Sequence, residues 1–253
     1  MRVCNVGNIE IGSGMPKICV PIVEKSRKDI IEYAEKVKSH NPDLVEWRAD
    51  YFDEVENKEE LLETAQELKK VLGEIPLIFT VRTFNEGGNL KVDPDKYLDI
   101  IKNVSMSNAA DIIDIEISRL SREDKHIVDN IKSGNCKIIL SYHNFKHTPG
   151  VEAMEKIISN MREYNPDIFK IAVMPLSKSD MITILQLAVD TEEKVERPVV
   201  IISMGKLGIA SRICGEIFGS SITFASLEKS SAPGQLNIDE LRNILETVHK
   251  NYL

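Results

Sequence analysis

The chain has 253 residues, enough for one full-sized hydrophobic core and close to the roughly 250 residues typical of a single α/β barrel. Its net charge of -8 and pI near 5.3 argue against a general nucleic-acid-binding protein, because such a protein needs clustered lysine and arginine. The apolar runs fall short of the roughly 18 residues of a membrane span, and the N-terminus lacks the apolar segment of a signal peptide, so we expect a cytoplasmic protein without a membrane partner.

Short β-rich runs alternate with longer helical patterns along the chain. The N-terminal segment predicts a β-hairpin, formed by Arg2–Val6 and Asn8–Gly12 and joined at Gly7. Eight strands are then expected, at Lys17–Ile22, Leu44–Arg48, Leu77–Arg82, Ile112–Glu116, Lys137–His143, Ile168–Val173, Val199–Ser203 and Ile222–Ser226. Helical periodicity follows each strand, over Lys28–Lys38, Lys58–Leu72, Pro94–Val104, Arg122–Lys132, Val151–Tyr164, Ser179–Glu193, Ile209–Phe218 and Ile238–Lys250.

This element order, a strand followed by a helix eight times, matches a (β/α)₈ barrel. The chief rival is a doubly wound open sheet, which usually carries a glycine-rich phosphate turn after its first strand. Here the first strand runs into Pro21–Glu24, which contains no glycine. Since no linker interrupts the pattern, we predict an α/β fold with one TIM-barrel domain over residues 1–253 and the hairpin as a plug for one end.

Strand alternation separates two kinds of side chain in five of the expected strands. One face is apolar and suits packing under the helices, so the other face must point into the barrel. That inner face carries Glu46, Arg48, Arg82, Asp114, Glu116, His143 and Lys170. Because a single buried charge costs several kcal/mol, these groups should occur in pairs. A buried Glu46–Arg48 ion pair without a chemical role is an open alternative, and so is a structural role for Asp114 and Glu116.

Lys170 is the most informative of these residues because it interrupts the apolar run Ile168–Val173. Lysine is rarely buried without a partner, and only a neutral amine is nucleophilic, so the run indicates an imine-forming lysine. His143 has a competing interpretation as a metal ligand together with His147, four residues further on. That spacing needs a helix, but the preceding run is typical of a strand and Pro149 follows closely, so we expect no metal.

Several short motifs occur in order at the ends of the expected strands. The motifs are Glu46-Trp47-Arg48-Ala49-Asp50, Arg82-Thr83 with Glu86-Gly87-Gly88, Ser141-Tyr142-His143, Asp167 to Pro175, Ser203-Met204-Gly205 with Ser211-Arg212, and Ser231 to Gln235. Together they resemble the type I 3-dehydroquinate dehydratases of the shikimate pathway, and the resemblance covers nearly the whole chain.

The resemblance implies the loss of water from 3-dehydroquinate to give 3-dehydroshikimate. Lys170 is similar to the residue that forms an imine with the C3 ketone. His143 is similar to the base that removes the C2 proton and the acid that helps the C1 hydroxyl leave, and Glu86 to its orienting partner. Because a protonated imine is itself an electron sink, no metal or organic cofactor is implied.

The resemblance also implies how the substrate is held. Arg212 is similar to the family's carboxylate-binding arginine, and Ser231 and Gln235 to residues of a loop that closes over the substrate. The Ser-, Pro- and Gly-rich stretch Ser226–Asn237 suits such a mobile lid. A homodimer is implied as well. The residues similar to those that hold the ring hydroxyls and the charge network are Glu46, Arg48 and Arg82.

Two alternative functions stay open. Another imine-forming barrel lyase, such as an aldolase acting on a phosphorylated sugar, would need a phosphate site after the seventh and eighth strands, where Gly205, Gly208 and Arg212 lie. A non-catalytic ligand-binding barrel should lack Lys170 or His143, and both are present.

Overall fold

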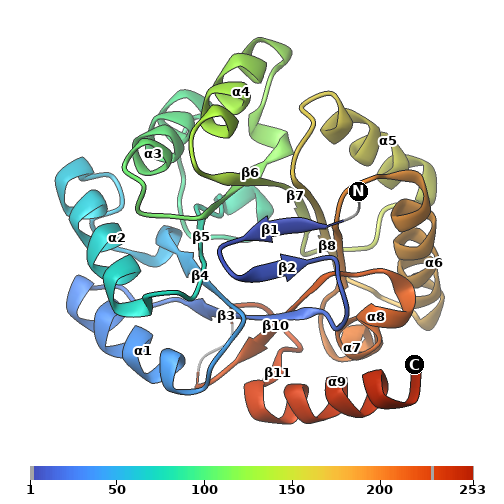
Figure 1. Cartoon of the computed structure of the whole chain (residues 1–253). Coiled ribbons are helices and arrows are strands. Elements are labelled where there is room, and N and C mark those ends of the chain that lie inside the picture. The colour runs from blue at the N-terminus through green and yellow to red at the C-terminus, as the bar shows by residue number, and fades with distance from the viewer. Residues whose placement is uncertain (1–2, 229–230, 253) are drawn as a thin grey trace.

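The computed structural model describes residues 3–228 and 231–252. In these two segments, eight parallel strands form a barrel inside a ring of helices (Figure 1). The barrel strands are β3 (Lys17–Ile22), β4 (Leu44–Arg48), β5 (Leu77–Thr80), β6 (Ile112–Glu116), β7 (Lys137–Asn144), β8 (Ile168–Val173), β9 (Val199–Ser203) and β10 (Ile222–Ser226). The nine-stranded sheet begins with the short β11 (Leu236–Asn237) and runs from β10 through β3 to β9. A bridge between Val199 and Ser220 brings β9 next to the start of β10 and closes the barrel. The predicted (β/α)₈ barrel is confirmed.

Helices cover the outside of the barrel. They are α1 (Arg27–Ser39), α2 (Lys58–Leu72), α3 (Pro94–Met106), α4 (Lys125–Ser133), α5 (Val151–Arg162), α6 (Lys178–Lys194), α7 (Ile209–Ile213), α8 (Gly215–Phe218) and α9 (Ile238–Tyr252). Asp93 and Ser177 are the N-caps of α3 and α6, and their side chains accept hydrogen bonds from backbone N–H groups in the first turns of these helices. Within the described segments, no helix is both long and apolar enough to cross a membrane.

A hairpin closes one end of the barrel. Its strands β1 (Cys4–Val6) and β2 (Ile9–Ile11) pair antiparallel, and Gly7 takes a positive φ of 57° in the turn between them. Ile11 is fully buried against side chains from the first halves of the barrel strands, such as Leu44 and Ile112. The hairpin lies in front of the barrel in Figure 1, as the predicted plug requires. Arg2, which was expected to begin it, lies outside the described residues.

The same local sequence motif occurs before three of the barrel strands in the described part of the chain. An asparagine in the left-handed conformation follows the preceding helix, and an aspartate comes two or three residues later. Each aspartate makes two hydrogen bonds to one residue of the neighbouring strand. Its backbone N–H donates to the carbonyl oxygen of that residue, and its carboxylate accepts the backbone N–H of that residue, so the register between the two strands is fixed. The pairs are Asp43 with Ile18, Asp111 with Leu77, and Asp167 with Ile138.

Three predicted elements differ from those in the structure. The strand expected over Leu77–Arg82 ends at Thr80, because the N–H of Arg82 turns away from the sheet and donates to Asp50. The helix expected over Ile209–Phe218 is split into α7 and α8 at Cys214. A turn named η4, over Arg122–Asp124, precedes α4 where one longer helix was expected.

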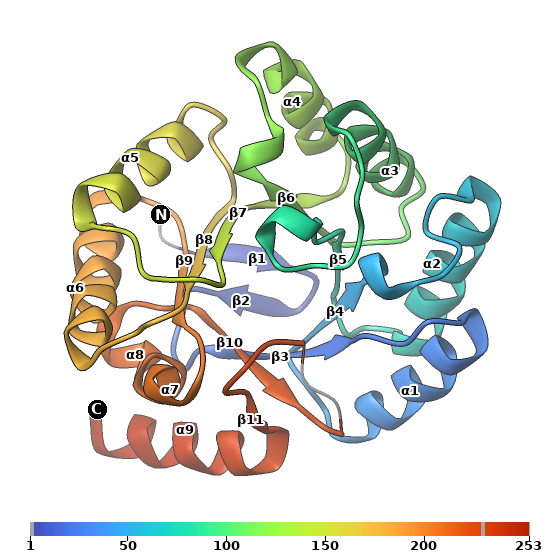
Figure 2. The ribbon, with the colours of Figure 1, turned by 180° about the vertical axis from the view of Figure 1, so that it is seen from behind.

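The predicted division of strand faces is confirmed. Trp47 and Phe79 point outward into the layer under the helices, where their rings meet edge to face with centroids 5.5 Å apart. Their neighbours Glu46 and Thr80 point inward and share a hydrogen bond of 3.0 Å between the hydroxyl and the carboxylate. The barrel interior is therefore polar toward the carboxyl ends of its strands, which is the end seen from the front in Figure 2.

Candidate active site

A pocket of about 450 Å³, counted with its open mouth, lies at the carboxyl ends of the barrel strands. Eight of the nine predicted site residues line it, namely Glu46, Arg48, Arg82, His143, Lys170, Arg212, Ser231 and Gln235. The ninth, Glu86, contacts His143 from behind. The pocket also has an apolar wall that was not predicted from the sequence, formed by Phe145, Ala172, Ile202, Met204 and Phe224. Strand alternation places Ala172 on the face of Lys170, but no sequence signal marks a loop residue such as Phe145.

Lys170 lies buried on β8 and is paired with two carboxylates. Its Nζ donates to Asp114 Oδ2 at 2.9 Å and to Glu46 Oε1 at 3.3 Å, and it lies 4.6 Å from the centre of the Phe224 ring. These are the contacts of an ammonium group with two carboxylates. Lys170 must therefore release a proton before its amine can attack a carbonyl carbon.

Asp114, on β6, accepts a hydrogen bond from Lys170 through its Oδ2 atom. Its other oxygen, Oδ1, accepts hydrogen bonds from Arg82 at 3.0 Å and from Ser141 at 2.6 Å. Burial alone would raise the pKa of Asp114, but Arg82 and Lys170 hold it well below its usual range. Asp114 is thus a fixed negative charge that orients the lysine.

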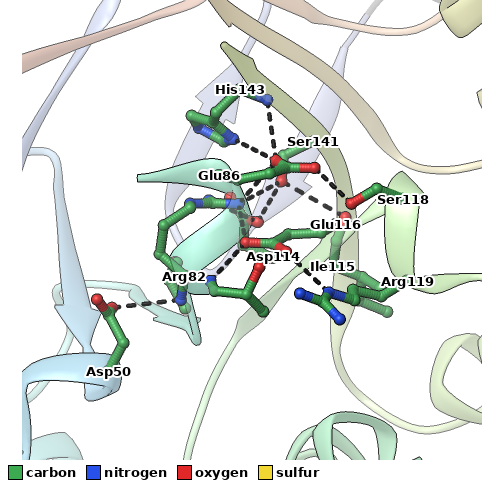
Figure 3. A network of polar contacts seen from close by, with 12 residues as sticks. Asp50, Arg82, Glu86, Asp114, Ile115, Glu116, Ser118, Arg119, Ser141 and His143 are labelled. Atoms are coloured by element: carbon green, nitrogen blue, oxygen red, sulfur yellow. Dashed lines mark hydrogen bonds and ion pairs between the residues drawn. The ribbon is translucent and has the colours of Figure 1, made fainter. Parts of the chain in front are cut away.

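Arg82 joins the acidic residues of β6 into one network (Figure 3). Its guanidinium donates to Glu116 Oε1 at 3.1 Å and to the Ser141 hydroxyl at 3.0 Å, in addition to Asp114. Glu116 also accepts from the N–H and the hydroxyl of Thr83, at 2.8 and 2.6 Å. Every charge in this network has an opposite charge or a donor beside it, as buried ions require.

His143 and Glu86 form a buried pair behind the pocket. Glu86 Oε2 lies 3.1 Å from His143 Nδ1 and accepts the His143 backbone N–H at 2.9 Å. Burial, together with the positive charges of Arg82 and Lys170, lowers the pKa of His143 well below its ordinary value, so the ring is neutral near pH 7. A neutral ring that donates its Nδ1–H to Glu86 carries a free lone pair on Nε2, as a general base needs.

The pKa of Glu86 shifts the other way. Burial and the nearby Glu116 carboxylate raise the pKa of Glu86 to about 8, although Arg82 opposes this shift. A carboxyl with this pKa is partly protonated near neutral pH. The hydrogen bonds from Ser118 and from the His143 backbone N–H lower the pKa and favour the ionised form, which accepts the Nδ1–H of His143.

Glu46 and Arg48 do not pair with each other, contrary to the alternative left open by the sequence. Arg48 instead binds Asp50 with two parallel hydrogen bonds of 2.7 and 2.8 Å, while Glu46 contacts Lys170. Asp50 follows directly after β4 in the chain, and its signal was its place in the Glu46–Asp50 motif.

Arg212 is fully buried on α7 and lacks a carboxylate partner among residues 3–228 and 231–252. It donates to the carbonyl oxygens of Phe224 at 3.5 Å and Pro233 at 3.1 Å, and its Nε has no partner within those residues. Burial lowers the pKa of Arg212 to about 10. A buried guanidinium facing a pocket without a counter-ion is suited to an anionic ligand.

The loop that bears Ser231 and Gln235 covers the side of the pocket next to Arg212. The Gln235 amide donates to the Ser231 hydroxyl at 3.0 Å and accepts the Ser231 N–H at 2.9 Å. The loop is tied down where the Gly205 N–H donates to Pro233 O at 3.0 Å. Residues 229 and 230 of the predicted lid lie outside the described residues.

The sequence of this chain matches a known protein family. Residues 18–252 match the family described as type I 3-dehydroquinase. A 3-dehydroquinate dehydratase from Clostridioides difficile (strain 630) is 39% identical over 252 residues, covering 99% of this chain and 98% of that protein. One from Listeria innocua is 35% identical over 247 residues, covering 98% of each.

Solved structures agree with the sequence comparison. The crystal structure of type I 3-dehydroquinate dehydratase from Clostridium difficile with covalently modified comenic acid has a TM-score of 0.95 and 39% identity, covering 99% of each chain. The 3-dehydroquinate dehydratase from Geobacillus kaustophilus also has a TM-score of 0.95, with 34% identity over 98% of this chain and 97% of the other. The chain therefore belongs to the type I 3-dehydroquinase family.

Proposed function

We propose that this protein dehydrates 3-dehydroquinate to 3-dehydroshikimate through an imine on Lys170, with His143 as general base and acid. One observation carries the proposal. The Lys170 amine and the neutral His143 ring line the same pocket, together with Arg212, a buried guanidinium without a counter-ion. A ketone, an acidic C–H bond and a carboxylate of one substrate would each find a matching group there.

The first step is the attack of the Lys170 amine on the C3 carbonyl. The ammonium proton passes to Glu46, because Arg82 and Ser141 keep Asp114 ionised. Loss of water then gives a protonated imine, which draws electrons from the adjacent C2–H bond.

The second step is the elimination. The free nitrogen of His143 takes the C2 proton, the electron pair moves toward the imine, and the C1 hydroxyl leaves as water when the same histidine returns the proton. Glu86 stabilises the ring while it is charged, since its Oε2 lies 3.1 Å from Nδ1. Hydrolysis of the product imine restores Lys170.

The remaining predicted residues position the substrate. Arg212 binds its carboxylate with a two-pronged hydrogen bond. Ser231 and Gln235, which bond to each other in this structure, exchange that contact for the substrate as the loop closes. Glu46, Arg48 and Arg82 supply the acceptor and the fixed charges near the ring hydroxyls.

The alternative of an aldolase for a phosphorylated sugar has less support. A phosphate site after the seventh and eighth barrel strands would use free backbone N–H groups. The N–H groups of Gly205 and Gly208 are already bonded, to Pro233 O at 3.0 Å and Gly205 O at 3.1 Å.

The test combines turnover with chemical trapping. Formation of the conjugated product is followed by ultraviolet absorbance, and borohydride is added with 3-dehydroquinate to reduce the imine. We expect an adduct on the Lys170 peptide by mass spectrometry. Lys170→Ala should abolish both turnover and adduct. His143→Ala should lower turnover by about 10²–10⁴-fold but still form the adduct.

The exposed Lys178 provides the matched control. Lys178→Ala should keep both turnover and adduct, because this lysine lies on the outer surface at the start of α6. Turnover by the unmodified protein without any adduct on Lys170 would contradict the imine mechanism.

We also propose that residues 1–253 form one catalytic domain that works as a homodimer in the cytoplasm. The closed barrel supports the single domain, and the buried free thiols of Cys4, Cys19 and Cys136 suit a reducing compartment. The dimer stays a prediction from the family resemblance.

A further inference from the structure

We propose that Ser118 is a positioning residue for the reaction. Its hydroxyl fixes the Glu86 carboxylate and thereby sets the orientation and the protonation state of His143. This inference rests on the proposed function of the Glu86–His143 pair.

The geometry places Glu86 between His143 and Ser118 (Figure 3). Ser118 belongs to η3, a single turn over Ile117–Arg119 directly after β6. Its hydroxyl donates to Glu86 Oε1 at 2.5 Å, while Oε2 faces the ring and backbone of His143 at 3.1 and 2.9 Å. The carboxylate is thus held at both ends, and it cannot rotate without breaking one of these contacts.

The other charged groups around Glu86 do not replace this contact. Arg82 Nη1 lies 3.7 Å from Oε2, on the side of His143, and the Glu116 carboxylate repels the negative charge of Glu86. Among residues 3–228 and 231–252, Ser118 is the one side chain that donates a hydrogen bond to Oε1. A donor stabilises the ionised carboxylate, and this is the form that can accept the Nδ1–H of a basic His143.

Ser118 is not among the residues that line the substrate pocket. It lines an adjoining hollow together with Glu86, Phe84 and Arg119, and this hollow shares His143 with the pocket. Its role is therefore exerted through Glu86. Because Ser118 itself is exposed to solvent, loss of its hydroxyl leaves no buried cavity, so an effect on catalysis can be separated from an effect on stability.

The experiment compares Ser118→Ala with Ser118→Thr, which keeps the hydroxyl. We expect Ser118→Ala to lower kcat at pH 7 about tenfold, which is the loss of one hydrogen bond to a charged group. Since loss of the donor raises the pKa of Glu86, the acid limb of the kcat/KM profile should move to higher pH by about one unit. Ser118→Thr should stay close to the unmodified protein, and both variants should keep its Tm.

Two controls make the result specific. Ser133→Ala removes an exposed hydroxyl that donates to a helix carbonyl, and it should leave kcat and the pH profile unchanged. In a Glu86→Gln background, Ser118→Ala should have little further effect, because the group through which it acts can no longer ionise. An unmoved acid limb in Ser118→Ala, or the same loss in both backgrounds, would overturn the inference.

A measurement without substrate separates this inference from the proposed function. The His143 ring is followed by NMR in ¹⁵N-histidine-labelled protein, with His143→Gln to assign its signal. Ser118→Ala should shift the pH at which that signal changes, and an unchanged titration would count against the role of Ser118. Failure of the unmodified protein to dehydrate 3-dehydroquinate would instead reject the proposed function.

Discussion

Two arginines of this site are equally buried but differ in their partners. Arg48 is neutralised by Asp50 through two parallel hydrogen bonds, whereas the Arg212 guanidinium, within the described residues, donates only to the carbonyl oxygens of Phe224 and Pro233. Burial without a counter-ion lowers the pKa of Arg212 to about 10. The fold therefore holds Arg212 at a cost in free energy that an anionic ligand would relieve.

This difference predicts opposite effects for the same substitution. Arg212→Met should raise KM for 3-dehydroquinate by about 10²-fold, the loss of a charge-assisted hydrogen-bonded pair, while Tm stays equal or rises. Arg48→Met leaves the buried Asp50 carboxylate without its counter-charge and should cost about 3–5 kcal/mol of stability. Steady-state kinetics and calorimetry measure the two effects. An Arg212→Met protein that unfolds as readily as Arg48→Met would refute the anion-site interpretation.

At the level of elements, the strand pattern carries most of what can be predicted. Period-two alternation places Glu46, Asp114 and Lys170 inside the barrel because a strand has only two faces. It does not say which charges meet, since that depends on the register between strands and on loop geometry. Hence the pairing of Arg48 with Asp50 was not predicted. The contact of Ser118 with Glu86 was missed for the same reason, as both residues lie in short turns.

The aspartates at strand starts show how a local motif sets that register. Asp43 accepts the Ile18 N–H at 2.7 Å and donates its own N–H to the Ile18 carbonyl at 3.0 Å. Asp43→Ala should lower the unfolding free energy by about 1–2 kcal/mol, and hence Tm by about 2–8 °C, because one strand N–H loses its acceptor. Asp43→Asn keeps an acceptor oxygen and should recover most of the loss. If Asp43→Ala has the same Tm as the unmodified protein, the backbone hydrogen bonds between the strands fix the register without Asp43.

Across the whole molecule, stability and chemistry belong to opposite ends of the barrel. The hairpin and the strand starts form an apolar layer at one end, and the pocket with its charged network lies at the other (Figures 1 and 2). The apolar cluster that begins at the hairpin extends along the barrel interior to Ala172, Ile202 and Phe224 of the pocket wall. This arrangement is usual for barrel enzymes, whose active sites are built on the loops at the carboxyl ends of the strands. The sequence predicted the hairpin as a plug because it precedes the first barrel strand and alternates apolar and polar residues.

Ile11 tests whether the two ends are energetically separate. Its side chain is fully buried in β2, among residues that include Cys19, Ile139 and Val200, so Ile11→Ala leaves a cavity in the closing layer. We expect a loss of about 2–5 kcal/mol, which lowers Tm by about 4–20 °C. KM and kcat at 25 °C should change less than about twofold, since distant sites act independently. Ile9→Ala, at a half-buried position on the same strand, is the matched control and should cost clearly less. A large change in KM in Ile11→Ala, with the protein still folded, would mean that the plug also shapes the pocket at the far end.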